Sequence, residues 1–259
     1  MEKLELIEKV PLTSHEKEVY RTLRTNVEFT GVENRVIAIT SCAPDEGKTT
    51  IAYNLAIAFA ENGKKALYID ADLRKSVFVQ RYGIEGNPKG LSHYLSGQVS
   101  LKDVVYKTNR DRLYVTPIGR FPSNPTELFN KDRFGQLLEE LKKVFDYVII
   151  DTPPLGSVVD AAVIAQKCDA SMLVVTSDEC SRNVVKRIFE AGFEIENADI
   201  TIAAQKPKLM PYIEQMRKNM SNDLEIDINC VNVKATTTEK LGFEGREEGI
   251  SAYAVVLLK

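Results

Sequence analysis

Between Arg35 and Thr176 the chain alternates short apolar runs with longer segments of helical spacing. The apolar runs are RVIAIT (35–40), ALYID (66–70), LYVTP (113–117), YVIID (147–151) and SMLVVT (171–176). Short runs rich in β-branched residues are typical of strands that are buried on both faces of a sheet. Because these runs alternate with helical segments, the pattern predicts a doubly wound α/β fold with a mainly parallel sheet.

Helical spacing is clearest near the N-terminus, where residues 16–29 place Val19, Leu23 and Val27 on one stripe. The pattern changes after about Arg187, and there we expect strands at 198–205, 231–237 and 251–259 with a helix at 207–224. This change predicts a first domain over residues 1–187 and a C-terminal αβ extension over residues 188–259.

Composition and charge exclude several classes of protein. The 259 residues carry a net charge of −3, which indicates no general surface for nucleic acid or for a membrane. The four cysteines form no CxxC pair, which argues against a zinc cluster and favours a reducing, cytoplasmic compartment. The N-terminal MEKLELIEKV is too charged for a signal peptide, and no apolar run approaches the ~20 residues of a membrane helix.

The stretch TSCAPDEGKTT (40–50) follows the first strand and precedes a predicted helix. Gly47, Lys48 and Thr49 fit the end of a phosphate-binding loop, whereas Cys42 stands where the usual pattern begins with Gly. In such a loop the backbone N–H groups and the helix N-terminus face the phosphates. Lys48 would reach the β- and γ-phosphates of a nucleotide, and the Thr49 hydroxyl would be a ligand of Mg²⁺.

Three acidic residues come at the ends of predicted strands. Asp70 and Asp72 follow ALYI, with Arg74 shortly after them, and Asp151 ends YVIID. Each aspartate alone would suit a helix cap or a surface loop. Because the carboxyl ends of parallel strands meet at one edge of a sheet, we interpret them as one site beside the phosphate loop.

These motifs together resemble a known family over residues 1 to about 183, the bacterial tyrosine kinases of the capsule and exopolysaccharide type. That family uses a variant P-loop without the first Gly. The second motif of the family matches Asp70, Asp72 and Arg74, and its Walker B strand matches Asp151. The nucleotide-binding residues of the variant loop correspond to Ser41, Pro44, Glu46, Gly47, Lys48, Thr49 and Thr50.

The resemblance implies a P-loop NTPase fold and an ATP-dependent protein-tyrosine kinase with Mg²⁺ as cofactor. It implies that Thr49, Asp72 and Asp151 hold Mg²⁺ and that Lys48 neutralises the γ-phosphate. Asp70 is our candidate for the base that takes the tyrosine proton, although Asp70 and Asp72 can exchange roles. The expected catalytic residues are therefore Lys48, Asp70, Asp72 and Asp151.

The resemblance also implies partners and a place in the cell. Kinases of this family are activated by a membrane-anchored protein of the polysaccharide export system, which would bring the chain to the inner face of the plasma membrane. Glu18, Arg21 and Arg24 resemble the motif through which the family assembles into rings. The same spacing also suits simple ion pairs on an exposed helix, so both interpretations stay open.

The septum-positioning and plasmid-partition ATPases share this fold but act as switches rather than kinases. Their loop carries an extra Lys near its start, and Ala43 occupies that position here. This residue favours a kinase, and an ATPase switch or scaffold without kinase output is the alternative.

The C-terminal part of the chain resembles a different protein. Residues from about 184 to 259 are similar to the C-terminal half of methylerythritol cyclodiphosphate synthase, through IENADITIAAQKPKLMPYIEQMR and VNVKATTTEKLGFEGREEGI. That enzyme holds a metal through an Asp-x-His, which this chain lacks, so the resemblance does not imply its activity. The tyrosine cluster of the kinases is also absent, since Tyr212 and Tyr253 are the tyrosines beyond residue 183. We interpret the chain as a hybrid kinase with impaired self-phosphorylation.

One hypothesis concerns the use of this segment. If residues 182–197 form a crossover helix, ADITIAA (198–204) would enter the parallel sheet as its last strand. Gln205 would then lie near the adenine edge, and truncation after Arg187 would destroy folding. The alternative is that the segment folds as a separate unit.

Overall fold

The computed structural model describes residues 2–7, 11–29, 31–155, 158–174, 194–237, 245–247 and 250–258. The chain divides into two compact units, Met1–Ser171 and Met172–Lys259. The expected domain boundary between residues 187 and 188 lies outside the described residues.

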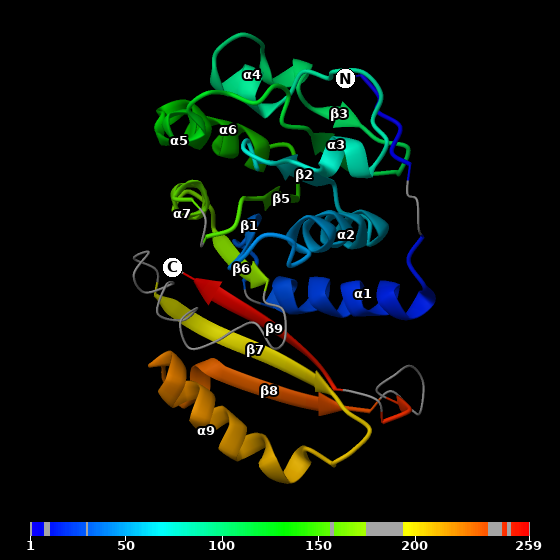
Figure 1. Ribbon diagram of the computed structural model, residues 1–259, viewed down its shortest axis with the longest axis vertical. Helices are drawn as coiled ribbons and strands as arrows, with labels where there is room; N and C mark the ends of the chain where they lie inside the picture. Colours follow the sequence, from blue (N-terminus) through cyan, green and yellow to red (C-terminus); the bar gives the residue numbers. More distant parts are fainter. Residues whose placement is uncertain are drawn as a thin grey trace. The chain divides into compact units, whose positions relative to one another are not determined.

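The first unit contains most of a six-stranded sheet in the order β3-β4-β2-β5-β1-β6 (Figure 1), whose edge strand β6 extends past the unit boundary at Ser171. Neighbours β1 and β5, β2 and β5, and β2 and β4 are parallel, whereas β3 runs antiparallel to β4. The prediction of a mainly parallel sheet is therefore confirmed, and each predicted apolar run between residues 35 and 176 overlaps one of its strands. The strands are β1 (Val36–Ser41), β2 (Ala66–Asp70), β3 (Tyr106–Lys107), β4 (Leu113–Thr116), β5 (Tyr147–Asp151) and β6 (Ala170–Val174).

Helices cover this sheet on both sides, as Figure 1 shows for α2 and α7 around β1 and β5. The helix α2 is buried nearly all round, because it packs on the sheet and is covered by α1. The helices of this unit are α1 (Ser14–Phe29), α2 (Lys48–Glu61), α3 (Phe78–Arg81), α4 (Leu91–Leu95), α5 (Pro125–Asn130), α6 (Asp132–Lys142) and α7 (Asp160–Ala165), with the 3₁₀ turn η1 (Leu101–Asp103). None of the helices in the described part of the chain is long and apolar enough to cross a membrane.

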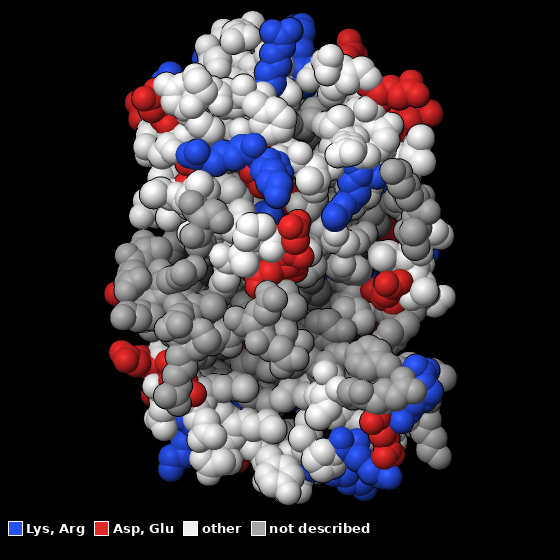
Figure 2. Space-filling model, in the orientation of Figure 1, with Lys and Arg blue, Asp and Glu red and all other residues white. Residues whose placement is uncertain are grey.

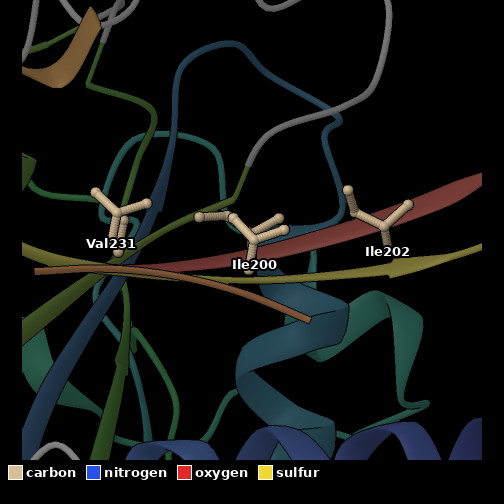
Figure 3. Packing of buried hydrophobic residues seen from close by; sticks show 5 residues of the cluster. Ile200, Ile202 and Val231 are labelled. Atoms are coloured by element: carbon tan, nitrogen blue, oxygen red, sulfur yellow. The ribbon is translucent and has the colours of Figure 1, made fainter. Parts of the chain in front are cut away.

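The second unit contains a three-stranded sheet in the order β8-β7-β9, with β7 parallel to β8 and antiparallel to β9. Its core consists of side chains from β7 and β8, and Figure 3 shows Ile200, Ile202 and Val231 on the same side of the sheet. Apolar residues of α9, including Ile213 and Met216, pack against this core. The elements are β7 (Ile195–Ala203), η2 (Met210–Tyr212), α9 (Ile213–Leu224), η3 (Ile228–Cys230), β8 (Val231–Thr236) and β9 (Ser251–Leu258).

This arrangement shows that the hypothesis of a shared last strand is wrong. Residues 198–203 of β7 pair with β8 on one edge and with β9 on the other, so the strand belongs to the smaller sheet. The hypothesis rested on the length and apolar spacing of the crossover and on the β-branched residues of the strand, whereas the segment carries its own pairing partners at 231–236 and 251–258. Gln205 follows β7 in this second unit, so the argument that placed it beside an adenine no longer stands.

A chain that ends at Asp178 is therefore expected to fold and to keep its nucleotide site. It retains all six strands of the first sheet and loses β7 together with both of its pairing partners. Circular dichroism should show one cooperative unfolding transition for this chain. A matched chain that ends at Gln166 lacks β6, the neighbour of β1, and is expected to be strongly destabilised. Loss of cooperative unfolding in the longer of the two would contradict this prediction.

Candidate active site

The phosphate-binding loop connects the end of β1 with the start of α2. Gly47 caps α2 in the left-handed region with φ of 87°, which glycine adopts without steric cost. Side chains close the rest of the loop: the Ser41 hydroxyl donates to the Ala43 carbonyl at 2.7 Å, and the Ala43 N–H donates to Glu46 at 2.7 Å. These bonds explain how the loop keeps its shape with Cys42 in place of the usual first glycine.

The predicted acidic residues are brought together at one edge of the sheet. The register of the parallel pair β2–β5 places Asp70 directly beside Asp151, and Asp72 follows two residues later. The Lys48 ammonium lies 3.9 Å from the Asp72 carboxylate, and both side chains are largely buried. The loop lysine and the three carboxylates thus form one cluster, as the sequence predicted.

Burial controls the protonation of this cluster. Desolvation, together with the charge of Asp151, raises the pKa of Asp70 well above its usual range. Desolvation also raises the pKa of Asp151 to about 6, against the opposing effects of Thr49, Lys48 and Tyr68. Without a cation these two adjacent carboxyls therefore favour the protonated form, and a divalent cation bound beside them would favour the ionised form.

Asp151 itself has a free oxygen for such a cation. Its Oδ1 atom is buried and makes no hydrogen bond to any residue in the described part of the chain. Carboxylate and hydroxyl oxygens are the ligands that Mg²⁺ prefers. Asp72, Asp151 and the Thr49 hydroxyl therefore fit Mg²⁺ as a donor set.

A pocket of about 230 Å³ opens beside the loop. Asp70 and Asp151 do not line it, and each is 1% exposed. Two basic residues at its wall, Lys75 and Arg81, were not identified from the sequence. The pocket is lined by Pro44, Asp45, Gly47, Lys48, Thr49, Asp72, Arg74, Lys75, Val77, Arg81, Pro153, Pro154 and Val158.

Arg74 is held by a residue that the sequence did not single out. Its guanidinium donates to Asp160, which is 1% exposed, at 2.6 Å and 3.1 Å in a bidentate pair. The Thr126 hydroxyl donates to the same carboxylate. Asp160 lies 86 residues from Arg74, and no local pattern marks it as a partner.

Arg81 ties α3 to the start of α2. Its guanidinium lies 2.5 Å from the hydroxyl of Thr50, which is the last residue of the predicted loop. On the face shown in Figure 2, basic and acidic side chains of the described residues are interspersed. The lining of the pocket has the same mixed character, with the basic residues Lys48, Arg74, Lys75 and Arg81 and the acidic residues Asp45 and Asp72.

The residues of the expected ring motif lie on α1 and differ in their surroundings. Arg21 and Glu18 form an exposed ion pair at 3.1 Å. Arg24 is more buried, and its guanidinium lies 3.3 Å from the Ala58 carbonyl of α2 and 3.7 Å from Glu28. Arg24 therefore contributes to packing within the chain, whereas Glu18 and Arg21 face solvent.

Comparison with known proteins identifies two families along the chain. The AAA domain model matches residues 34–202, and the YgbB family model matches residues 158–259. Tyrosine-protein kinase CpsD of Streptococcus agalactiae is 39% identical over 249 residues, which cover 96% of this chain and 98% of the relative. Tyrosine-protein kinase YwqD of Bacillus subtilis is 40% identical and covers 67% of this chain and 74% of its own length.

Solved structures agree with this assignment. The chimerical protein CapA2B2 has a TM-score of 0.65 at 31% identity, covering 73% of this chain and 88% of that one. The kinase domain of the Escherichia coli tyrosine kinase ETK has a TM-score of 0.62 at 38% identity, covering 68% of this chain and 71% of that one. Because the AAA model and the CpsD match each span well over half of the chain, it belongs to the tyrosine-protein kinases of the CpsD type, with a C-terminal region that matches the YgbB family.

Proposed function

We propose that the first unit binds Mg²⁺-ATP at the phosphate loop and transfers the γ-phosphoryl group to a tyrosine hydroxyl. The observation that carries this proposal is the convergence of Lys48, Asp72 and Asp151 at one edge of the sheet, beside the start of α2. Phosphoryl transfer needs positioning and charge stabilisation more than covalent chemistry. Positioning and charge stabilisation are both supplied here, by a lysine, a helix N-terminus and a pair of carboxylates that can hold a cation.

Each residue has a distinct task in this proposal. Backbone N–H groups of the loop and of the first turn of α2 hold the phosphate oxygens. Lys48 neutralises charge on the transferred group, and Thr49, Asp72 and Asp151 would hold Mg²⁺. A cation held by these residues would supply further neutralisation of the phosphate charge.

A carboxylate of the Asp70–Asp72 pair accepts the proton of the acceptor tyrosine. A base works best when its pKa lies near the operating pH, which favours Asp70, whose pKa burial raises. Asp72 has the more accessible position, because it lines the pocket. Since Asp72 also pairs with Lys48, we propose it mainly as a cation ligand and Asp70 as the base.

The acceptor is proposed to lie outside the C-terminal segment. This segment carries Tyr212 and Tyr253 rather than a tyrosine cluster, so self-phosphorylation should be weak. A membrane-anchored activator of polysaccharide export is the proposed partner, by the family resemblance. The chain would then act in capsule biosynthesis as a peripheral protein at the inner face of the membrane.

Incubation with Mg²⁺-ATP and a tyrosine-containing acceptor peptide tests the proposed reaction. Phosphopeptide mass spectrometry should detect phosphotyrosine on the peptide, and a parallel assay should measure phosphate release. Phosphate release without phosphotyrosine would favour the ATPase switch instead of the kinase. Intact-mass measurement of the chain in the same reaction reports any self-phosphorylation.

Assembly into a ring is a further proposal, which rests on Glu18 and Arg21. Arg21→Ala removes an exposed side chain and is expected to reduce any oligomer to smaller species without loss of stability. Arg24→Ala is a poorer test, because Arg24 also contacts the Ala58 carbonyl within the chain. Light scattering measures the outcome, and a monomeric wild-type protein would contradict the proposal directly.

The YgbB match raises cyclodiphosphate formation as a second candidate activity. By resemblance, that enzyme needs an Asp-x-His to hold its metal, and this sequence contains none. By the same resemblance, the stretch from Thr236 to Glu239 would contact the phosphates of the substrate, and residues 238 and 239 lie outside the described residues. We therefore propose that the match reflects ancestry of the segment rather than its activity.

A further inference from the structure

Tyr68 places a hydroxyl group at the centre of the cluster. It lies in the middle of β2, is fully buried, and is on the same face of the strand as Asp70. Its hydroxyl donates to Oδ2 of Asp151 at 2.9 Å, across to the neighbouring strand β5. In a parallel sheet core most strand residues are apolar, so a buried hydroxyl bonded to a carboxylate is a specific feature.

Neighbouring rings hold the Tyr68 side chain in place. The ring stacks on Phe78 with centroids 4.4 Å apart, and it meets Tyr53 edge-on at 5.7 Å. Because Tyr68 is fully buried among these rings, the packing opposes movement of its hydroxyl away from Asp151. The donor is therefore preset before any ligand binds.

The hydroxyl acts only as a donor. A tyrosine hydroxyl carries one proton, and Tyr68 donates that proton to Asp151 at 2.9 Å. Asp151 accepts this bond through Oδ2 alone, while its buried Oδ1 makes no hydrogen bond in the described part of the chain.

We infer that Tyr68 is a positioning residue, which fixes the Asp151 carboxylate through Oδ2 so that Oδ1 is presented to a divalent cation. The inference rests on the proposed function and extends it to a residue outside the motifs. Partners that orient a ligating carboxylate typically contribute about 10- to 100-fold to metal affinity or activity. Tyr68 needs no contact with nucleotide to have this effect.

Tyr68→Phe tests the inference, because it keeps the ring and removes only the hydroxyl. The readout is the affinity for a non-hydrolysable ATP analogue, measured by calorimetry with and without Mg²⁺. We expect the Mg²⁺ concentration for half-maximal binding to rise about tenfold, within the range for such partners. Binding without Mg²⁺ should stay unchanged.

Tyr53→Phe is the matched control, since it removes a hydroxyl from the same aromatic cluster. It should leave the Mg²⁺ dependence as in the wild type. Equal Mg²⁺ dependence in Tyr68→Phe and wild type would overturn the inference. So would a thermal destabilisation shared by both variants without any change in Mg²⁺ dependence.

An Asp151→Asn background tests whether Tyr68 affects Mg²⁺ binding through Asp151 or in some other way. If Tyr68 acts through Asp151, Tyr68→Phe should have little further effect on Mg²⁺ dependence in that background. A full additive effect there would overturn the inference. A wild-type protein that binds the analogue equally with and without Mg²⁺ would instead overturn the proposed function, and the inference with it.

Discussion

Lys48→Met is expected to abolish turnover and to weaken Mg²⁺-ATP binding by about 100-fold, the effect of losing one strong charge-assisted hydrogen bond. Lys48 is the one basic residue in the loop from Ser41 to Thr50, so no neighbour in the loop replaces its charge. The substitution also removes the cation 3.9 Å from Asp72 and leaves that carboxylate less compensated. Methionine keeps most of the aliphatic stem, so the fold should persist.

Isothermal calorimetry with ATP and Mg²⁺ measures this prediction. Lys64→Met is the matched control, because Lys64 is exposed and lies beyond the opposite end of α2. It should bind as the wild type does. Wild-type affinity in Lys48→Met would show that this loop is not the nucleotide site.

Asp151→Asn is expected to lower turnover about 100-fold while ATP binding falls much less, because a charged cation ligand is lost. The amide has the same shape as the carboxylate and can still accept the Tyr68 hydroxyl. Steady-state kinetics at saturating Mg²⁺ separate the two effects. Unchanged turnover would remove Asp151 from the mechanism.

The same variant should change how stability depends on pH. Burial raises the pKa of Asp151 from 3.8 to about 6, so its ionised form opposes folding. The protonated form of Asp151 therefore stabilises the fold. This stabilisation is fully present below pH 3.8 and is lost as the pH rises through about 6. Without Mg²⁺, the wild type should gain stability on going from pH 7 to pH 5 relative to Asp151→Asn. Denaturant unfolding at both pH values measures the difference, and parallel profiles would contradict it.

The sequence by itself determined the local elements and the loop. Strands such as YVIID and the helix after Gly47 are predictable because apolar spacing and glycine geometry act within a few residues. The meeting of Asp70, Asp72 and Asp151 was also predictable, since parallel strands end at a common edge. Arrangements that follow from local pattern plus one topological rule can be inferred without coordinates.

Only the tertiary structure decided which strands and side chains become partners over long distances. The strand β7 had a suitable pattern for the larger sheet, but it pairs with β8 and β9. No local pattern in the sequence indicates which of the available strand edges β7 will join. The contacts of Tyr68 with Asp151 and of Arg74 with Asp160 join residues 83 and 86 positions apart. A tyrosine in an apolar strand is indistinguishable from a core residue until the register of the sheet places its hydroxyl beside a carboxylate.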